Sequence, residues 1–220
     1  MTTLRFRTIA FDLDGTLADT APDLAAALNH TLAFLGRRTV ALAEVRGMIG
    51  HGVRALLRNG LAATGGADEA SLDAGLPEMM RFYEAHLCDL TTPYPGVSET
   101  LDALSDRGIV LALCTNKPEL LALGLVEQLG WRHRFAAIVG GDTLAVSKPD
   151  AAPLHEAVKR AGGGPAAFVG DSIVDVQTAR AAGVPCIAVS FGFADRPADQ
   201  LGADAVIDRF DALLSALGAL

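Results

Sequence analysis

Two aspartates stand two positions apart near the start of the chain, in the segment Asp12-Leu13-Asp14-Gly15-Thr16. Side chains of an extended segment alternate in direction, so this spacing places both carboxylates on one side. Gly15 permits a tight turn, and the backbone N–H groups from Thr16 onward can form a nest for an anion. The segment therefore combines two acids with a turn that can bind an anion.

Three more polar clusters each follow a short apolar run of strand-like composition. They are Thr115-Asn116-Lys117, Lys148-Pro149 and Gly170-Asp171-Ser172, with Asp175 one helical turn after the last. A single aspartate at the end of a strand is more often a helix cap or a turn former. Four such clusters in an otherwise apolar chain instead indicate one shared site.

The residue types in these clusters predict a site for a metal ion and a phosphoryl group. Asp12, Asp14 and Asp171 would repel one another unless a cation neutralised them, and oxygen ligands without His or Cys favour Mg²⁺. Lys148 adds a compact positive charge, and the Thr-Asn pair of the second cluster adds neutral donors. Such a set suits a group whose negative charge is spread over several oxygens.

Six β-rich runs alternate with helical patterns along the chain. They are residues 8–12, 109–114, 136–139, 166–169, 186–189 and 205–207. Most are nearly continuously apolar, which is typical of strands buried on both faces of a parallel sheet. The alternation predicts an α/β fold with a doubly wound, Rossmann-like parallel sheet. Ligands of such sheets bind outside the carboxyl ends of the strands, where all four clusters fall.

The alternation stops between residues 20 and 92, where only helical periodicity is found. Three apolar stripes run through this segment, and the third contains Pro77, a residue type that kinks or breaks helices. Some seventy residues without a strand are too many for one crossover between strands. We therefore expect a helical cap domain at residues 20–92, inserted into a core domain made of residues 1–19 and 93–220.

The four clusters resemble the motifs of the haloacid dehalogenase-like hydrolase superfamily. The matching segments are Phe11-Asp12-Leu13-Asp14-Gly15-Thr16-Leu17, Thr115-Asn116, Lys148-Pro149 and Gly170-Asp171 with Asp175, in that family's order. The resemblance covers the whole chain. It implies Mg²⁺-dependent phosphoryl transfer from a small phosphorylated metabolite.

The resemblance also implies a role for each acidic group. Asp12 would be the nucleophile and Asp14 the general acid and base, because such an acid can protonate a leaving alcohol and then activate water. The carboxylates of Asp12 and Asp171 and the main-chain carbonyl of Asp14 would hold Mg²⁺. Asp175 would orient Lys148 or the metal shell. Dehalogenase and phosphonatase relatives lack an acid at the position of Asp14, so the chain looks like a phosphotransferase or a phosphatase.

The remaining matched groups would contact the phosphate. The resemblance implies that Thr115 and Asn116 bind it and that Lys148 balances the charge of nucleophile and phosphate. The turn at Gly15 and Thr16 is expected to add backbone N–H groups.

Local strings in the chain indicate a substrate class. Asp19-Thr20-Ala21-Pro22-Asp23-Leu24, Ile49-Gly50-His51-Gly52 and Cys114-Thr115-Asn116-Lys117-Pro118 resemble bacterial phosphoglycolate phosphatases. Sugar-phosphate mutase relatives usually carry His where Leu24 stands. We therefore expect hydrolysis of 2-phosphoglycolate to glycolate and phosphate. The alternative is a phosphatase for another small ester, such as a sugar phosphate or a nucleotide, and a phosphomutase or a non-catalytic binding protein is less favoured.

Selectivity is expected from the helical insert, because the core handles only the phosphoryl group. Gly50-His51-Gly52-Val53-Arg54 is a short glycine turn that opens a helix. Arg54 is our first candidate for binding a substrate carboxylate, through two parallel hydrogen bonds, and His51 is the second. The alternative is that both residues line a solvated helix start.

Composition argues against several other classes of protein. The 220 residues carry a net charge of −8 without a run of Lys or Arg, which argues against nucleic acid and against a charged membrane surface as partners. The sequence contains neither the roughly 18 apolar residues of a membrane span nor the apolar core of a signal peptide. Three separated cysteines predict reduced thiols and a cytoplasmic location. A monomer and a homodimer both stay open.

Overall fold

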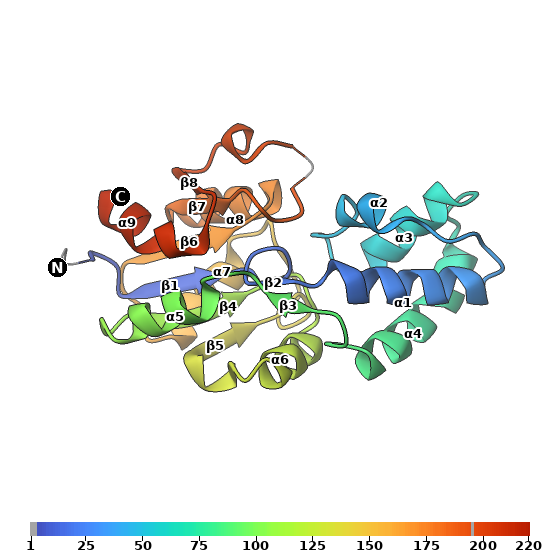
Figure 1. Ribbon diagram of the computed structural model, residues 1–220, viewed down its shortest axis with the longest axis horizontal. Helices are drawn as coiled ribbons and strands as arrows, with labels where there is room; N and C mark the ends of the chain where they lie inside the picture. Colours follow the sequence, from blue (N-terminus) through green and yellow to red (C-terminus); the bar gives the residue numbers. More distant parts are fainter. Residues whose placement is uncertain (1–3, 195) are drawn as a thin grey trace.

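The computed structural model describes residues 4–194 and 196–220 and places six parallel strands in one sheet (Figure 1). Their order across the sheet is β5-β4-β1-β6-β7-β8. The strands are β1 (Thr8–Phe11), β4 (Val110–Cys114), β5 (Phe135–Val139), β6 (Ala166–Gly170), β7 (Cys186–Val189) and β8 (Ala205–Ile207). Each predicted strand is present within a residue or two of its expected limits, and the α/β fold class is confirmed.

The central strand β1 is the point where the winding of the sheet reverses. It pairs in parallel with β4 on one side and with β6 on the other. The chain therefore fills one half of the sheet, through β4 and β5, before it fills the other half, through β6, β7 and β8. This is the Rossmann strand order, in which ligands bind at the carboxyl ends of the strands beside the reversal. Asp12 and Thr115 each follow one of these strands directly.

Helices cover both faces of the sheet, because both faces of its strands are apolar. One face packs against α7 (Ala152–Arg160) and α8 (Ile173–Ala182), and the other against α5 (Val97–Ser105), α6 (Glu119–Gln128) and α9 (Leu213–Ala219). Three short 3₁₀ helices join these elements: η1 (Arg132–Arg134), η2 (Ala198–Gln200) and η3 (Phe210–Ala212). Within the described part of the chain, no helix combines the length and the apolar character needed to cross a bilayer.

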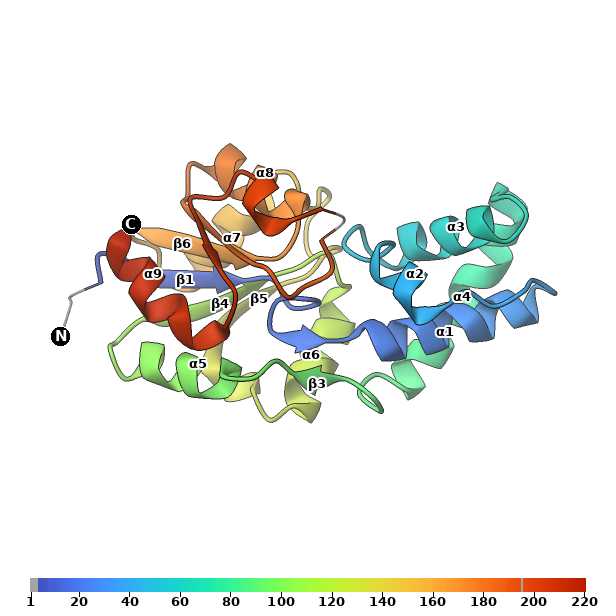
Figure 2. The same cartoon turned by 45° about the horizontal axis from the view of Figure 1, so that its top comes forward.

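Four helices form a separate group beyond the carboxyl ends of the strands (Figures 1 and 2). They are α1 (Ala21–Phe34), α2 (Leu42–Arg46), α3 (Val53–Ala63) and α4 (Glu69–Ala85). Buried apolar side chains of this group are continuous with those of the core face that carries α5 and α6. The domain limits set from the sequence stay a prediction, but the predicted run of helices lies where a cap would cover the strand ends.

Helix α4 continues through Pro77 without a break. A proline inside a helix removes one backbone hydrogen bond and costs about 3 kcal/mol in an isolated helix. Here Leu72, Met79 and Tyr83 are fully buried, and burial of such side chains stabilises the helix by about 1.5–3 kcal/mol each. Packing therefore outweighs the local preference. The predicted third stripe lies on this one helix except for its last member, and its members are Leu72, Leu76, Met80, Tyr83 and, beyond the end of the helix, Leu87.

The two connections between the core and the helical group run side by side. Strands β2 (Ala18–Asp19) and β3 (Thr92–Pro93) pair antiparallel, a ribbon that the sequence analysis did not predict. Next to it, the buried carboxylate of Asp23 in α1 accepts hydrogen bonds from the N–H groups of Leu90 and Thr91 and from the Thr91 hydroxyl, at 2.7–3.1 Å. Asp23 thereby ties the outgoing connection to the returning one.

Candidate active site

Asp12 directly follows β1, and both oxygens of its carboxylate have fixed partners. Oδ1 accepts a hydrogen bond of 2.7 Å from the N–H of Leu13, and Oδ2 lies 2.9 Å from Nζ of Lys148. The side chain is almost completely buried. This geometry presents a carboxylate in one orientation at the centre of the carboxyl edge of the sheet.

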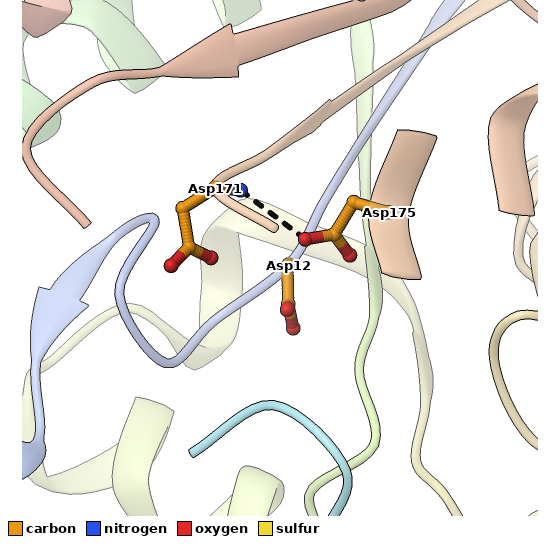
Figure 3. Close-up of side chains that lie close together, drawn as sticks. All are labelled: Asp12, Asp171 and Asp175. Carbon is orange, nitrogen blue, oxygen red and sulfur yellow. Dashed lines mark hydrogen bonds between the residues drawn. The ribbon is translucent and has the colours of Figure 1, made fainter. Parts of the chain in front are cut away.

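Asp171 and Asp175 reach the same place from the end of β6 and the first turn of α8 (Figure 3). Oxygen atoms of Asp12, Asp171 and Asp175 lie within 4.8 Å of one another. Asp171 accepts hydrogen bonds from the hydroxyl of Thr16 at 3.0 Å and from the N–H of Phe193 at 2.7 Å. Two segments far apart in the sequence, at Thr16 and at Phe193, therefore hold this acid in place.

The carboxylate of Asp175 is already occupied by protein groups. Its Oδ1 accepts a hydrogen bond of 2.6 Å from Lys148 Nζ. Its Oδ2 accepts from the N–H of Asp171 and from the N–H and hydroxyl of Ser172, which closes a capping box at the start of α8. Of the two functions expected for Asp175, orientation of Lys148 has direct contacts in the structure.

Lys148 is a buried cation between two buried acids. Burial lowers its pKa, but the Asp12 and Asp175 carboxylates outweigh that effect and hold the pKa above the ordinary value for lysine. The ammonium group therefore stays charged at neutral pH, where it can offset negative charge on Asp12 and on a bound phosphate.

The acid cluster of Asp12, Asp171 and Asp175 contains three carboxylates beside the one ammonium group of Lys148. This excess of negative charge suits a divalent cation. Burial raises the pKa of Asp12 to about 6 despite the neighbouring Lys148. Burial, together with the nearby acids, raises the pKa of Asp171 well above the usual range. Both shifts have the sign expected for carboxylates that are buried with too little compensating charge. Oxygen ligands of this kind suit a hard divalent ion.

The turn at Gly15 brings the first cluster against Asp171. Gly15 has φ +80°, and a Cβ at this position would lie 2.4 Å from Asp171 Oδ2. A side chain is therefore excluded by both the backbone conformation and the space available. The hydroxyl of Thr16 donates to Asp171, so in this structure it positions an acid of the cluster.

The second cluster supplies one hydroxyl at the wall of the pocket and one bridging amide. Thr115 lines the pocket, and its oxygen accepts a long hydrogen bond of 3.2 Å from the N–H of Lys117. The amide of Asn116 donates to the carbonyls of Gly50 and Lys148 at 3.1 Å and accepts from the N–H of Lys148 at 3.0 Å. Asn116 thus joins the core loops to the glycine turn of the helical group.

Lys117 is a functional candidate to which the sequence alone assigned no role. Its ammonium lies 3.0 Å from Asp14 Oδ1 and 2.5 Å from the hydroxyl of Tyr83 in α4, and its side chain is 1% exposed. The sequence contained a signal for it. The chain has only three lysines but fifteen arginines, so a lysine is unusual at any position, and Lys117 directly follows the Thr-Asn pair of the second cluster.

These groups surround one small pocket between the core and the helical group. Its volume is about 30 Å³. Its lining residues are Asp12, Asp14, Thr115, Asn116 and Lys117 from the core, and Leu24, Ile49, Gly50, Gly52, Val53 and Leu56 from the helical group. The core supplies all the charged groups in this lining, and the helical group supplies apolar side chains and glycine backbone.

The two residues predicted to bind a substrate carboxylate are not brought into this pocket. Arg54 is 46% exposed and forms ion pairs with Glu69 and Asp73 of α4, at 2.7 and 3.5 Å. His51 lies in a neighbouring recess beside Ser172 and Phe193. The glycine turn itself contacts the core, since a Cβ on Gly52 would lie 3.2 Å from the Asn116 carbonyl oxygen.

The fold and this site together define an enzyme that acts on phosphoryl groups at the carboxyl edge of a Rossmann-like sheet. The family profile described as haloacid dehalogenase-like hydrolase matches residues 9–189. The chain belongs to this family, which confirms the family predicted from the four clusters.

Similar proteins agree with this placement over nearly the full chain. A phosphoglycolate phosphatase of Agrobacterium fabrum is 46% identical over 210 residues, which are 94% of this chain and 90% of the relative. One from Mesorhizobium japonicum is 45% identical over 93% of this chain and 92% of the relative. The crystal structure of a predicted phosphoglycolate phosphatase from Haemophilus somnus superimposes with a TM-score of 0.91 at 30% identity, over 96% of this chain and 98% of that one.

Proposed function

We propose that this phosphatase hydrolyses 2-phosphoglycolate to glycolate and phosphate, through an aspartyl-phosphate intermediate on Asp12, with Mg²⁺ as its metal ion. The observation that carries the proposal is the joint position of Asp12 and Asp14. Both line one small pocket, and Asp12 is held there by Lys148. A fixed carboxylate and a second acid in one pocket suit covalent catalysis with acid–base assistance.

In the first step, Asp12 attacks phosphorus and the bond from phosphorus to the glycolate oxygen breaks. Asp14 gives its proton to that oxygen, so glycolate leaves with a neutral hydroxyl group. Lys148 offsets the negative charge on the Asp12 and phosphoryl oxygens. Thr115 contributes a hydroxyl to the phosphoryl group from the wall of the pocket. These groups are already fixed in position, which lowers the cost of reaching the transition state.

In the second step, Asp14 takes a proton from a water molecule, which attacks phosphorus and releases phosphate from Asp12. The proton that Asp14 gave up is thereby replaced. The expected metal ligands are the carboxylates of Asp12 and Asp171 and the main-chain carbonyl of Asp14. When Mg²⁺ is bound, it supplies positive charge that offsets these carboxylates and the phosphoryl oxygens. Asp175 holds Lys148 and the start of α8.

The pocket in this structure, about 30 Å³, has room for about one water molecule. The helical group therefore moves when any phosphate ester binds, 2-phosphoglycolate included, and the pocket volume does not choose among the small esters. The proteins at 45–46% identity carry the name phosphoglycolate phosphatase, which favours the two-carbon acid over the other small esters. Three free cysteines, two of them buried, support a reducing, cytoplasmic setting.

Phosphate release over a panel of small metabolites with Mg²⁺ tests this proposal. The panel contains 2-phosphoglycolate, ethyl phosphate, hexose phosphates and nucleoside monophosphates. We expect the highest kcat/KM for 2-phosphoglycolate. A higher value for a hexose phosphate or a nucleotide would overturn the substrate while leaving the phosphatase chemistry in place.

A further inference from the structure

A two-carbon acid phosphate offers an enzyme little apolar surface, so the substrate carboxylate must be recognised by charge or by hydrogen bonds. A cation that lines the pocket, in addition to the one that serves the phosphoryl group, can supply both the charge and the hydrogen bonds. Among the described residues that line the pocket, Lys117 is the only cation. Lys148 lies behind Asp12, where its ammonium contacts Asp12 and Asp175.

Cations of the helical group that lie near the pocket are occupied elsewhere. Arg54 pairs with Glu69 and Asp73 at the surface. Arg46 pairs with Asp19 at 2.6 Å and lies over the ring of Phe193. A substrate in the pocket would have to break one of these contacts to recruit either arginine.

Lys117 is held in place but keeps a hydrogen to donate. An ammonium group carries three donors. In the structure one is directed to Asp14 and one to the Tyr83 hydroxyl, whose ring also lies 4.5 Å from Nζ. Lysine is almost never fully buried unless its charge is paired, and among the residues that the structure describes Lys117 has one carboxylate partner, Asp14, at the wall of a pocket. A substrate carboxylate would complete its contacts.

Tyr83 couples this ammonium to the helical group. It lies in α4, is fully buried, and reaches from the helical group to a lysine of the core. Burial raises the pKa of the Tyr83 hydroxyl, which therefore stays protonated at neutral pH. Its oxygen can accept from the ammonium while its ring stabilises the positive charge.

We propose that Lys117 is the specificity-determining residue for the substrate carboxylate and that Tyr83 is its positioning residue. This inference rests on the proposed function, since it assigns the carboxylate of 2-phosphoglycolate to a particular cation. Recognition is then completed only when α4 is packed on the core. Lys117 belongs to the core, whereas the residues expected from the sequence to bind the carboxylate, Arg54 and His51, belong to the helical group.

Lys117→Met tests the assignment, because methionine keeps an unbranched chain and removes the charge. Values of kcat/KM are measured for 2-phosphoglycolate and for ethyl phosphate, which has a two-carbon alkoxide leaving group but no carboxylate. Any effect of the variant on Asp14 changes kcat/KM for both substrates, so the ratio of the two values measures the contribution of the substrate carboxylate alone. We expect this ratio to fall by about ten- to a hundred-fold, as for loss of one charge-assisted hydrogen bond. Lys159→Met, an exposed lysine of α7, is the matched control and should leave the ratio unchanged.

Inhibition by the product adds a readout that a purely structural role of Lys117 would not move. In Lys117→Met the inhibition constant for glycolate should rise by a similar factor, while that for inorganic phosphate should change less than about threefold. Tyr83→Phe keeps the ring and removes the hydroxyl. It should lower the ratio of kcat/KM for 2-phosphoglycolate to kcat/KM for ethyl phosphate several-fold, mainly through a higher KM for 2-phosphoglycolate. This variant tests the assignment if Lys117→Met does not fold.

The possible failures are distinguishable. If the unaltered enzyme does not prefer 2-phosphoglycolate to ethyl phosphate, the proposed substrate falls and this inference falls with it. If the enzyme prefers 2-phosphoglycolate but Lys117→Met lowers kcat/KM for both substrates by the same factor, the proposed substrate stands and Lys117 acts only through Asp14. An unchanged ratio in a foldable Lys117→Met, or in Tyr83→Phe when that is the variant available, would overturn the inference.

Discussion

The carboxyl edge of the sheet and the helical group that covers it contribute to the pocket in opposite ways. At the sheet edge the charged groups are buried and fixed by short contacts, as for Asp12, Lys148 and Asp175. The wall from the helical group is made of apolar side chains and glycine backbone, and the charge of Arg54 is used in surface pairs. Fixed charges at the edge suit stabilisation of a transition state, whereas an apolar cover excludes water. We infer that the core determines the chemistry and that the helical group determines access.

Loss of the nucleophile gives the largest expected effect on the core side of this comparison. Asp12→Asn keeps the shape of the side chain but removes the attacking carboxylate, so we expect turnover to fall by on the order of 10⁴-fold or more. Phosphate release measures it, and circular dichroism checks the fold. Asp106→Asn, in the exposed turn after α5, is the matched control and should retain full activity. A residual rate of a tenth in Asp12→Asn would refute covalent catalysis at this residue.

Asp14→Asn separates acid–base work from nucleophilic attack. We expect a loss of about 10²–10⁴-fold for ethyl phosphate, because its alkoxide needs a proton to leave. For an aryl phosphate the first step should suffer much less, since the phenolate leaves without help. Burst-phase release of the phenol measures that step directly. Equal losses in the first step on both substrates would show that Asp14 does not protonate the leaving group.

Removal of the metal tests the acid cluster as a unit. A chelator should silence the enzyme, and Mg²⁺ should restore it. Asp171→Asn removes one expected ligand charge, so about 10- to 100-fold more Mg²⁺ should be needed for half-maximal activity. The same titration on Asp106→Asn should match the unaltered protein. Full activity in excess chelator would contradict the metal site altogether.

The smallest effect is expected on the helical side. Arg54→Met removes a cation that the structure pairs with Glu69 and Asp73 at the surface, and exposed ion pairs contribute about 0–1 kcal/mol. We expect kcat/KM for 2-phosphoglycolate to change less than about twofold. A tenfold loss of kcat/KM confined to 2-phosphoglycolate would show that Arg54 binds the substrate carboxylate. It would contradict the conclusion that the helical group contributes no charge to the pocket.

The strands and the positions of the site loops followed from the sequence because they depend on local signals. A continuous apolar run such as Ala166–Gly170 predicts a buried strand by itself, and parallel strands end at one edge of a sheet. Asp12, Asp171 and Lys148 were therefore placed together without knowledge of their side-chain contacts. The structure adds the contacts themselves, including the Asn116 amide that joins Lys148 to Gly50.

The contacts between the helical group and the core could not be obtained in the same way. An apolar stripe tells which face of α4 is buried, but it does not tell which core loop that face meets. Tyr83 lies in the apolar stripe of α4, but the contact of its hydroxyl with Lys117 depends on how the helix packs on the core. The position of Arg54 likewise depends on α4, because its partners Glu69 and Asp73 come from that helix. Long-range packing of this kind has no local sequence signal.

Chemical trapping of the intermediate tests the central claim most directly. The enzyme with Mg²⁺ is mixed with 2-phosphoglycolate that carries a radioactive label in its phosphoryl group, and the reaction is stopped in acid within the first turnover. The protein is then reduced with borohydride and digested for peptide mapping. An acyl phosphate on Asp12 would be reduced to homoserine at position 12, and the label would be present on the protein only before reduction. We predict that outcome in the unaltered enzyme and its absence in Asp12→Asn. A single turnover that releases phosphate without any label on the protein, or with label on another residue, would contradict the account.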